Sequence, residues 1–363
     1  MKKIDIILGV RSDFIQGSSL YAAFSAYEDI LELRYIHTGE DTDHELSTDI
    51  IDQLGLHINS FLPEAGNEGI RKFASIMLNY DEHMIFDKPD LILVFGNSDS
   101  ALAATMVGSR NSIPVGHIDA GARFLDHSVI EEQNDLQIDR LSTYLFTSNE
   151  ESVINLIREG YDNRNIIEVG NLRSDSVFMN LGFAEDSDVL ERNGLISGNY
   201  ILLTLHHDHI LKNTEFLISF FNMLEDLSSD VMIYVCLHPK TSNLLDDLPE
   251  LILDPGDNFQ LVSSRNYQDM LKLQKNAALV VTDSQGLQDE TTILGVNCLT
   301  LGNSSNRPAT FSKGTNSLAG FDISRIRSFI LAILSGESKD GYPIDNWDGK
   351  VGQRIAKFIT ELS

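Results

Sequence analysis

Short apolar runs of strand length alternate along the chain with segments whose apolar residues recur at helical spacing. The runs in the first half are KIDIILGV, LELRYIHTG, LILVFGN, PVGHIDAG, YLFTSN and NIIEVGN; those in the second half are YILLTLHH, VMIYVCLHP, FQLVSS, ALVVTDS and CLTLGN. This alternation predicts right-handed βαβ units and parallel sheets. Runs such as ILLTL and ALVV are apolar on both faces, as strands covered by helices on both sides should be.

Helices are expected between these runs. The first strand is predicted to end in Arg11, with a helix from about Ser18, and a second helix is predicted over residues 67–85, where FASIMLNYDEHMI has apolar residues at helical spacing. The polar, turn-rich segment SGESKDGYPIDNWDGK precedes a final helix, VGQRIAKFITELS.

The alternation restarts after VGNLRSD, near residue 172. We therefore predict two Rossmann-like, doubly wound domains: residues 1–172, and residues 173–345 as the nucleotide-binding domain. Residues 346–363 would pack back on the first domain as a C-terminal helix. Two such domains facing each other would bury a cleft, with functional residues gathered at the strand ends.

Charge narrows the range of partners. The 363 residues include 54 acids and 27 bases, a net charge of −27, which argues against nucleic acid or an anionic membrane. Solubility alone explains most of this excess, yet an anionic ligand would still need a local positive pocket.

No apolar segment is long enough to span a bilayer, and the N-terminus lacks a signal peptide pattern. Cys236 and Cys298 form no metal-spaced pair and are expected to be buried, reduced thiols of a cytoplasmic protein.

Polar residues follow many of the predicted strands. They are Arg11, Asn97, His117, Asp119, His206, His207, His238, Asp283, Ser284 and Arg307. In TLHH, His206 is the first residue off a buried strand and is a candidate for binding phosphate or a ring oxygen; His207 is interpreted as a surface residue.

The segment TDSQGLQDE, residues 282–290, has the form of a strand, a turn and a helix. Ser284 can cap the helix, the free N–H groups of the first turn can hold a phosphate, and Gly286 allows close approach of a ligand. Asp289 and Glu290 lie one turn on, where a carboxylate can accept from ribose hydroxyls. An ordinary N-cap with acids favoured by the helix dipole explains this segment about equally well.

Carboxylates for proton transfer are offered by HIDAGAR and IEEQND. These segments can bring Asp119 together with Glu131 or Glu132, one group to take a proton and one to return it. The alternative for IEEQND is the acidic first turn of an ordinary helix. Arg307, in NRPATFSKGTN, is either a phosphate or carboxylate partner or a surface arginine.

Taken in order, these motifs resemble the non-hydrolysing UDP-N-acetylglucosamine 2-epimerase family. The family reads approximately HVEAGLR…PEExNR, TLHRxEN, TDSGGIQEEA and TERPExxxxGT, against GHIDAGARFLDHSVIEEQND, TLHH, TDSQGLQDE and RPATFSKGT here. The resemblance implies a GT-B fold, a UDP-sugar substrate, no metal or cofactor, and a homodimer. It also implies inversion at C2 by elimination and re-addition of UDP.

By resemblance, Arg11, His206, Ser284, Gly286, Glu290 and Arg307 occupy nucleotide-binding positions. Glu131 matches a family carboxylate, and Asp119 replaces a glutamate. The chain departs from the family at four positions, because Gln16 replaces a lysine, Gln285 a glycine, Asp135 an arginine and Asn97 a catalytic aspartate.

Two hypotheses follow. In the first, the protein is an active UDP-sugar 2-epimerase in which Asp119 and Glu131 carry the proton transfers. In the second, it is a paralogue that keeps the fold but binds, hydrolyses or transfers a sugar nucleotide without C2 chemistry. The first hypothesis predicts that Asn97→Asp raises epimerase activity if the rest of the site is intact.

Overall fold

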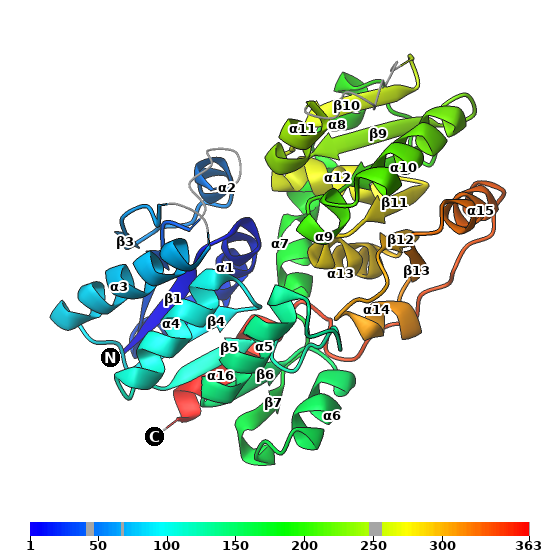
Figure 1. The fold of residues 1–363 in the computed structure, drawn as a ribbon. Coiled ribbons are helices and arrows are strands. Elements are labelled where there is room, and N and C mark those ends of the chain that lie inside the picture. Colours follow the sequence, from blue (N-terminus) through cyan, green and yellow to red (C-terminus); the bar gives the residue numbers. More distant parts are fainter. Residues whose placement is uncertain (41–46, 67–68, 247–255, 363) are drawn as a thin grey trace. The chain divides into compact units, whose positions relative to one another are not determined.

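The computed structural model describes residues 1–40, 47–66, 69–246 and 256–362. They divide into two compact units: unit 1 is Met1–Met179 with Asp345–Ser363, and unit 2 is Asn180–Ile344. Each unit has one parallel β-sheet flanked by helices (Figure 1). The predicted α/β class with two Rossmann-like domains is confirmed.

The sheet of unit 1 has seven strands in the order β3-β2-β1-β4-β5-β6-β7. Their bounds are β1 Lys2–Leu8, β2 Leu31–His37, β3 Ser60–Phe61, β4 Leu91–Phe95, β5 Val115–Ile118, β6 Tyr144–Thr147 and β7 Ile166–Glu168. The chain builds outward from β1 in one direction and then restarts at β4 on its other side. The strand order therefore reverses between β1 and β4, which makes the carboxyl ends of these two strands a topological switch point.

The sheet of unit 2 repeats this topology with six strands in the order β10-β9-β8-β11-β12-β13. Their bounds are β8 Tyr200–Thr204, β9 Met232–Leu237, β10 Phe259–Ser263, β11 Leu279–Thr282, β12 Cys298–Leu301 and β13 Asn316–Gly320. Its switch point lies between β8 and β11, which pair in parallel from Leu279 with Ile201 to Thr282 with Thr204.

Helices connect the strands in both units. Unit 1 contains α1 Arg11–Phe24, α2 Thr48–Gln53, α3 Ile70–Phe86, α4 Asp99–Arg110, α5 Ile130–Leu141, α6 Glu150–Arg158 and α16 Val351–Glu361, with 3₁₀ turns at Ser25–Tyr27 and Asn163–Asn165. The helix α7, Arg173–Glu185, begins in unit 1 and ends in unit 2. Unit 2 contains α8 Val189–Arg192, α9 Asp208–Leu211, α10 Thr214–Leu227, α11 Pro239–Asp246, α12 Tyr267–Asn276, α13 Gln285–Leu294, α14 Pro308–Ser312 and α15 Ile323–Leu334.

Each sheet is the centre of its own hydrophobic core. In unit 2, the Leu217, Phe220, Phe221 and Leu224 side chains of α10 lie on one face of the helix and are fully buried against the sheet. Full burial of one such side chain is worth about 1.5–3 kcal/mol. These buried faces hold the strand ends, and with them the candidate residues, in fixed positions.

The start of α1 differs from the sequence-based expectation. The strand ends at Leu8, and the helix begins at Arg11 and not near Ser18. The reason is Asp13, whose carboxylate accepts the backbone N–H groups of Gly9 at 3.0 Å and Val10 at 3.2 Å and so stabilises the first turn. Arg11 is therefore the first residue of a helix and not the last residue of a strand.

Two strands lie where no apolar run marks them. The strand β3 is only two residues long, and β13 has the sequence NSLAG. Both are edge strands, so pairing with a neighbour defines them more than their own composition does. The helix expected over residues 67–85 is observed as Ile70–Phe86; its first two expected residues lie outside the described part of the chain.

The C-terminal segment belongs to unit 1. The Asp175 carboxylate accepts the backbone N–H groups of Val351 at 3.0 Å and Gly352 at 2.8 Å, at the start of α16. Gly352 lets α16 approach α1 closely, because a Cβ at this position would stand 2.8 Å from the Cβ of Ala23. Just before α16, the Trp347 indole N–H donates to the Ser148 carbonyl at 2.9 Å.

Both cysteines are buried and free, as predicted, and burial raises the pKa of each thiol to about 12. Among the described helices, none has the length and apolar character needed to cross a membrane. Within the same residues, no three His, Cys, Asp or Glu side chains are grouped so as to hold a metal ion.

Candidate functional site

The candidate residues cluster around the two switch points. In unit 1, Arg11 lies just after β1, and Asn97 lies just after its neighbour β4. In unit 2, His206 follows β8 and Ser284 follows β11. Ligands of doubly wound sheets bind outside the carboxyl ends of strands at such points, so each unit presents its own candidate ligand-binding edge.

At the end of β1, Arg11 is partly exposed, whereas Gln16 is 7% exposed on the buried side of α1. A helix N-terminus with an arginine in its first turn can attract an anion. The location of Gln16 does not by itself reveal a ligand contact, so its substrate-binding role stays a prediction.

Asn97, at the end of β4, is hydrogen-bonded to α5 through both its side chain and its backbone. Its Nδ2 donates to Asp135 Oδ2 at 2.9 Å, and Asn134 Nδ2 donates to its carbonyl oxygen at 2.9 Å. Asp135 is 1% exposed, and burial raises the pKa of its carboxyl to about 7, although His117 and Asn97 act to lower it. Two of the four positions at which the chain departs from the family pattern, Asn97 and Asp135, therefore form one hydrogen-bonded pair.

A buried ion-pair network lies beside this pair. The Nδ1 atom of His117 is 2.6 Å from Asp139 Oδ1, and its Nε2 is 2.8 Å from the Gly96 carbonyl oxygen. Because the carbonyl can only accept, Nε2 carries a proton, and a carboxylate at Nδ1 favours a second one. Burial lowers the pKa of His117, but Asp139 more than offsets this and the pKa is raised. Asp139 also pairs with Arg123 at 2.7 Å, so the network holds the end of β5 rigidly.

Asp119 lies one residue beyond β5 and has left-handed backbone geometry, with φ of 78°. A non-glycine residue in this region is uncommon, although Asp tolerates it better than most. Its backbone N–H donates to the Phe146 carbonyl at 3.0 Å, and its side chain is 9% exposed. The backbone turn therefore fixes the point from which this carboxylate projects.

The two glutamates of IEEQND have different surroundings. Glu132 is 1% exposed and accepts the backbone N–H of Phe124 at 2.6 Å, which ties the loop after β5 to α5. Glu131 is partly exposed in the first turn of α5. Of these two carboxylates, Glu131 is the one placed to meet a ligand, and Glu132 has a structural contact.

In unit 2, His206 and Asp283 link the ends of β8 and β11. The Nδ1 atom of His206 is 3.1 Å from Asp283 Oδ1, and the same carboxylate accepts the backbone N–H groups of His206 at 3.0 Å and His207 at 2.8 Å. Burial raises the pKa of Asp283, but the His206 ring and these N–H groups outweigh it and leave the pKa well below its usual value. Asp283 is therefore an anion that orients a partly exposed histidine.

The start of α13 has the predicted strand, turn and helix. Ser284 is the N-cap, its Oγ accepts the Leu287 N–H at 3.5 Å, and its own N–H donates to Thr282 Oγ1 at 2.9 Å. Ser284, Gln285 and Gly286 are all partly exposed. The helix therefore presents its positive N-terminal end at the strand edge, as an anion site requires.

Arg307 lies against this helix start. Its Nη2 is 3.4 Å from Gln285 Oε1, and its Nε is 3.5 Å from Asp289 Oδ2. Glu290, in contrast, is 2% exposed and accepts from Gln274 Nε2 at 2.7 Å. The proposed contact of Glu290 with a ribose stays a prediction.

Sequence reasoning assigned no role to several polar residues that organise these edges. Asp283 and His117 were recognised only as strand-end residues, and Asp139 was not singled out. A buried Asp directly after a strand, level with a histidine after the neighbouring strand, is a signal that could have identified Asp283.

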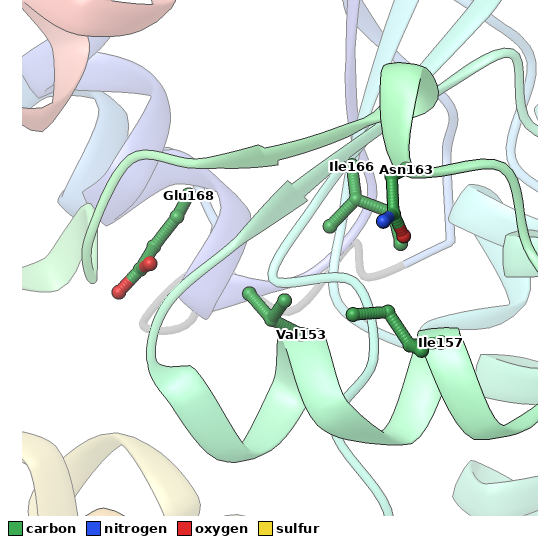
Figure 2. A pocket seen from close by; sticks show the side chains of 5 residues that line it. All are labelled: Val153, Ile157, Asn163, Ile166 and Glu168. Atoms are coloured by element: carbon green, nitrogen blue, oxygen red, sulfur yellow. The ribbon is translucent and has the colours of Figure 1, made fainter.

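One surface pocket in unit 1 lies away from these residues, beside the edge strand β7. Figure 2 shows its lining: Val153, Ile157, Asn163, Ile166 and Glu168, from α6, the turn after it and β7. None of the candidate residues lines it, so we do not connect it with the chemistry.

Comparison with known proteins adds independent evidence. Residues 25–360 match the family model described as UDP-N-acetylglucosamine 2-epimerase. The UDP-N-acetylglucosamine 2-epimerase of Methanocaldococcus jannaschii is 30% identical over 374 residues, covering 99% of both chains. The UDP-2,3-diacetamido-2,3-dideoxy-D-glucuronate 2-epimerase of Pseudomonas aeruginosa is 27% identical, covering 99% of this chain and 100% of the relative.

A crystal structure of the M. jannaschii UDP-GlcNAc 2-epimerase in complex with UDP-GlcNAc and UDP matches with a TM-score of 0.91 and 29% identity, over 99% of each chain. The paired doubly wound sheets and this match define a two-domain protein of the GT-B type. Within that class, the chain belongs to the UDP-N-acetylglucosamine 2-epimerase family, whose members are isomerases.

Proposed function

We propose that this protein inverts C2 of a UDP-2-acetamido sugar by eliminating UDP and adding it back. The observation that carries the proposal is the full-length match to an epimerase crystallised with UDP-GlcNAc and UDP. The groups at the two switch points fit the demands of this reaction. Proton transfer needs carboxylates, and the leaving diphosphate needs positive charge and free N–H groups.

The proton transfers are the work of Asp119 and Glu131. A base removes the C2 proton while the bond from C1 to the diphosphate oxygen breaks, which leaves a glycal and free UDP. UDP then adds back to C1, and a proton is delivered to the opposite face of C2. Support comes from the fixed turn at Asp119 and from the partly exposed first turn that carries Glu131. Asn97 contributes hydrogen bonding, because an amide neither takes nor gives a proton near neutral pH.

In unit 2, the residues proposed to hold the nucleotide are His206, the turn of residues 284–286 and Arg307. In unit 1, Arg11 is the proposed anion-binding residue. Arg307 lies beside the start of α13, the helix that Ser284 caps. Its guanidinium and the backbone N–H groups of the first turn are therefore available to the same ligand. Both suit a diphosphate, and the positive N-terminus of α13 favours it further. This local positive charge opposes the overall net charge of −27.

UDP-N-acetylglucosamine is the first substrate to test. One relative, at 27% identity, is named for a 2,3-diacetamido uronate, so a panel of UDP-2-acetamido sugars altered at C3 and C6 belongs in the same assay. Incubation in deuterated water with NMR detection should show deuterium at C2 and formation of the C2 epimer. No deuterium incorporation with any member of the panel would refute the epimerase proposal.

A paralogue without C2 chemistry gives a different result in the same experiment. Release of UDP without exchange at C2 would indicate hydrolysis. Binding of UDP by calorimetry with neither release nor exchange would indicate a binding protein. The three outcomes are separable in one set of samples.

We also propose a cytoplasmic homodimer. The cytoplasmic location is supported by two buried free thiols, since disulfides are rare in that compartment. Association is supported by exposed apolar side chains on α3, among them Leu78 at 63%, Ile85 at 72% and Phe86 at 90% exposure. Light scattering of the protein eluted from a size-exclusion column should give about twice the chain mass of 40.5 kDa. The Phe86→Glu variant should have a lower mass, closer to that of one chain.

A further inference from the structure

Asn97 and Asp135 form a hydrogen bond between a partly exposed amide and a carboxylate buried directly behind it. Asn97 Nδ2 donates to Asp135 Oδ2 at 2.9 Å, and the backbone of Asn97 is tied to α5 by Asn134. Asp135 is 1% exposed, so it reaches the strand end only through the amide.

The charge state of Asp135 decides which way the amide of Asn97 points. An ionised carboxylate can only accept, so Asn97 must turn its NH₂ group inward and its Oδ1 outward. A protonated Asp135 carries an O–H donor, which can be satisfied by Asn97 Oδ1. The amide can then turn around and point NH₂ outward. The two states therefore offer a ligand an acceptor or a donor at the same place.

The surroundings of Asp135 leave it near the balance between these two states. The cations that act on it are His117 from β5 and Arg123 from the loop that follows, and Asp139 lies one turn further along its own helix. Glu131 lies one turn earlier on α5, and Asp99 begins α4, which packs against α5. Burial raises the pKa of Asp135 to about 7, while His117 and the Asn97 hydrogen bond act to lower it.

We propose that Asp135 is a positioning residue of this site: its carboxylate holds Asn97 with the amide oxygen toward the sugar, and protonation of Asp135 releases that orientation. The outward oxygen accepts a hydrogen bond from a hydroxyl or an amide N–H of the sugar. The inference rests on the proposed epimerase function for its effect on rate. Its structural part, the coupling of Asp135 protonation to the Asn97 amide, stands independently of the reaction.

The coupling is tested first in the unaltered protein by NMR. With ¹³C at the aspartate carboxyl carbons and ¹⁵N in the asparagine side chains, the carboxyl signals of Asp13 and Asp135 should both titrate near pH 7. The signal that disappears in Asp135→Asn is that of Asp135. The Asn97 NH₂ signals, identified by their loss in Asn97→Asp, should shift with the same midpoint. Asn97 signals that do not follow the Asp135 titration would overturn the inference, whatever the enzyme assay shows.

The effect on rate is tested with side chains of equal size. In Asp135→Asn the amide of Asn97 can be satisfied in either orientation, so kcat should fall about tenfold, the value of one hydrogen bond. In the unaltered protein, kcat should decrease as the pH drops through 7. In Asp135→Asn, this decrease should be absent. A wild-type kcat and a wild-type pH profile in this variant would contradict the inference.

The exchanged pair, Asn97→Asp with Asp135→Asn, supplies the matched control. The carboxylate now stands at the strand end and the amide behind it, so the hydrogen bond is kept and an acceptor oxygen again faces the sugar. This double variant should recover most of the activity lost in Asp135→Asn. Equal activity in the single and double variants would contradict the inference, with thermal unfolding used to confirm that both are folded. If the unaltered protein shows no C2 exchange, the epimerase proposal fails, and the NMR titration alone decides the coupling.

Discussion

Asp283, the residue after β11, holds His206, two residues after β8, with a distance of 3.1 Å from Oδ1 to Nδ1. The same carboxylate accepts the backbone N–H groups of His206 and His207, so it fixes both the ring and the chain that carries it. This contact crosses the switch point of unit 2. It gives the histidine a defined tautomer and orientation, which a phosphate ligand requires.

We expect Asp283→Asn to lower kcat/KM for the UDP-sugar by roughly ten- to a hundredfold, because a neutral amide no longer favours a proton on His206 Nδ1. Initial rates of epimerisation measure the effect. Asp322→Asn is the matched control, because Asp322 is an exposed carboxylate that also accepts a backbone N–H, from Arg325 at 3.0 Å, on a helix without candidate residues. Equal losses in both variants would remove the special role of Asp283.

Substitutions of the two neighbouring glutamates of α5, Glu131 and Glu132, should differ in their effect on the rate of C2 exchange. Glu131→Gln is expected to reduce C2 exchange by about 10²–10⁴-fold, since a proton-transfer group is lost. Glu132→Gln should leave the rate nearly unchanged, because the amide oxygen can still accept from the Phe124 N–H. Deuterium exchange at C2 by NMR is the measurement, and Glu150→Gln, an exposed acid in the first turn of α6, is the control. A larger loss in Glu132→Gln than in Glu131→Gln would reverse the assignment.

The alternation of apolar runs and helical segments was sufficient to predict two parallel sheets. Parallel strands bring their carboxyl ends to one edge, so the residues after β1, β4, β8 and β11 could be named as candidates without a structure. The strand β13 was not predicted because its sequence, NSLAG, lacks a β-rich apolar run, and its burial comes from pairing with β12. The start of α1 was misplaced because the contacts of Asp13 with Gly9 and Val10 were not considered.

The pairing of side chains could be predicted much less well. Sequence comparison showed Asn97 and Asp135 as two separate departures from a family pattern, whereas the structure joins them by one hydrogen bond. Which face of α5 turns toward β4 depends on packing between elements and not on local pattern. The pairing also changes what is expected of Asn97→Asp alone. That variant would place two carboxylates in contact, which must share a proton, so Asn97→Asp alone should not give the increase in activity expected from the sequence.

The side chain of Gln285 contacts that of Arg307 next to the start of α13, with a distance of 3.4 Å from Oε1 to Nη2. Removing this side chain with Gln285→Gly should free the guanidinium for the diphosphate and raise the affinity for UDP about three- to tenfold. Glycine in a helix costs about 1 kcal/mol relative to alanine, so a small decrease in thermal stability should accompany the gain. Calorimetry with UDP measures the affinity.

Gln285→Glu is the opposite variant: its carboxylate would pair with Arg307 and repel the diphosphate, so weaker binding is expected. Tighter binding in Gln285→Glu would contradict this interpretation of the contact.

Asp13 should make the stability of the fold depend on pH in a characteristic direction. Burial raises the pKa of its carboxyl from 3.8 to about 7, against the lowering effect of the Gly9 and Val10 N–H groups. The folded protein therefore binds this proton more tightly than the unfolded chain does. Its contribution to stability is complete below about pH 4 and is lost as the pH rises through 7.

In Asp13→Asn no proton is exchanged at this position. The difference in free energy of unfolding between variant and wild type should therefore move in favour of the variant from pH 4 to pH 8, by an amount on the order of a few kcal/mol. Denaturant unfolding at a series of pH values measures this difference. Asp162→Asn is the control of opposite sign, because Arg164 lowers the pKa of that exposed carboxyl to about 2 and its effect is confined to the acid end. A constant difference between Asp13→Asn and wild type across this range would show that Asp13 is ionised in the folded protein throughout.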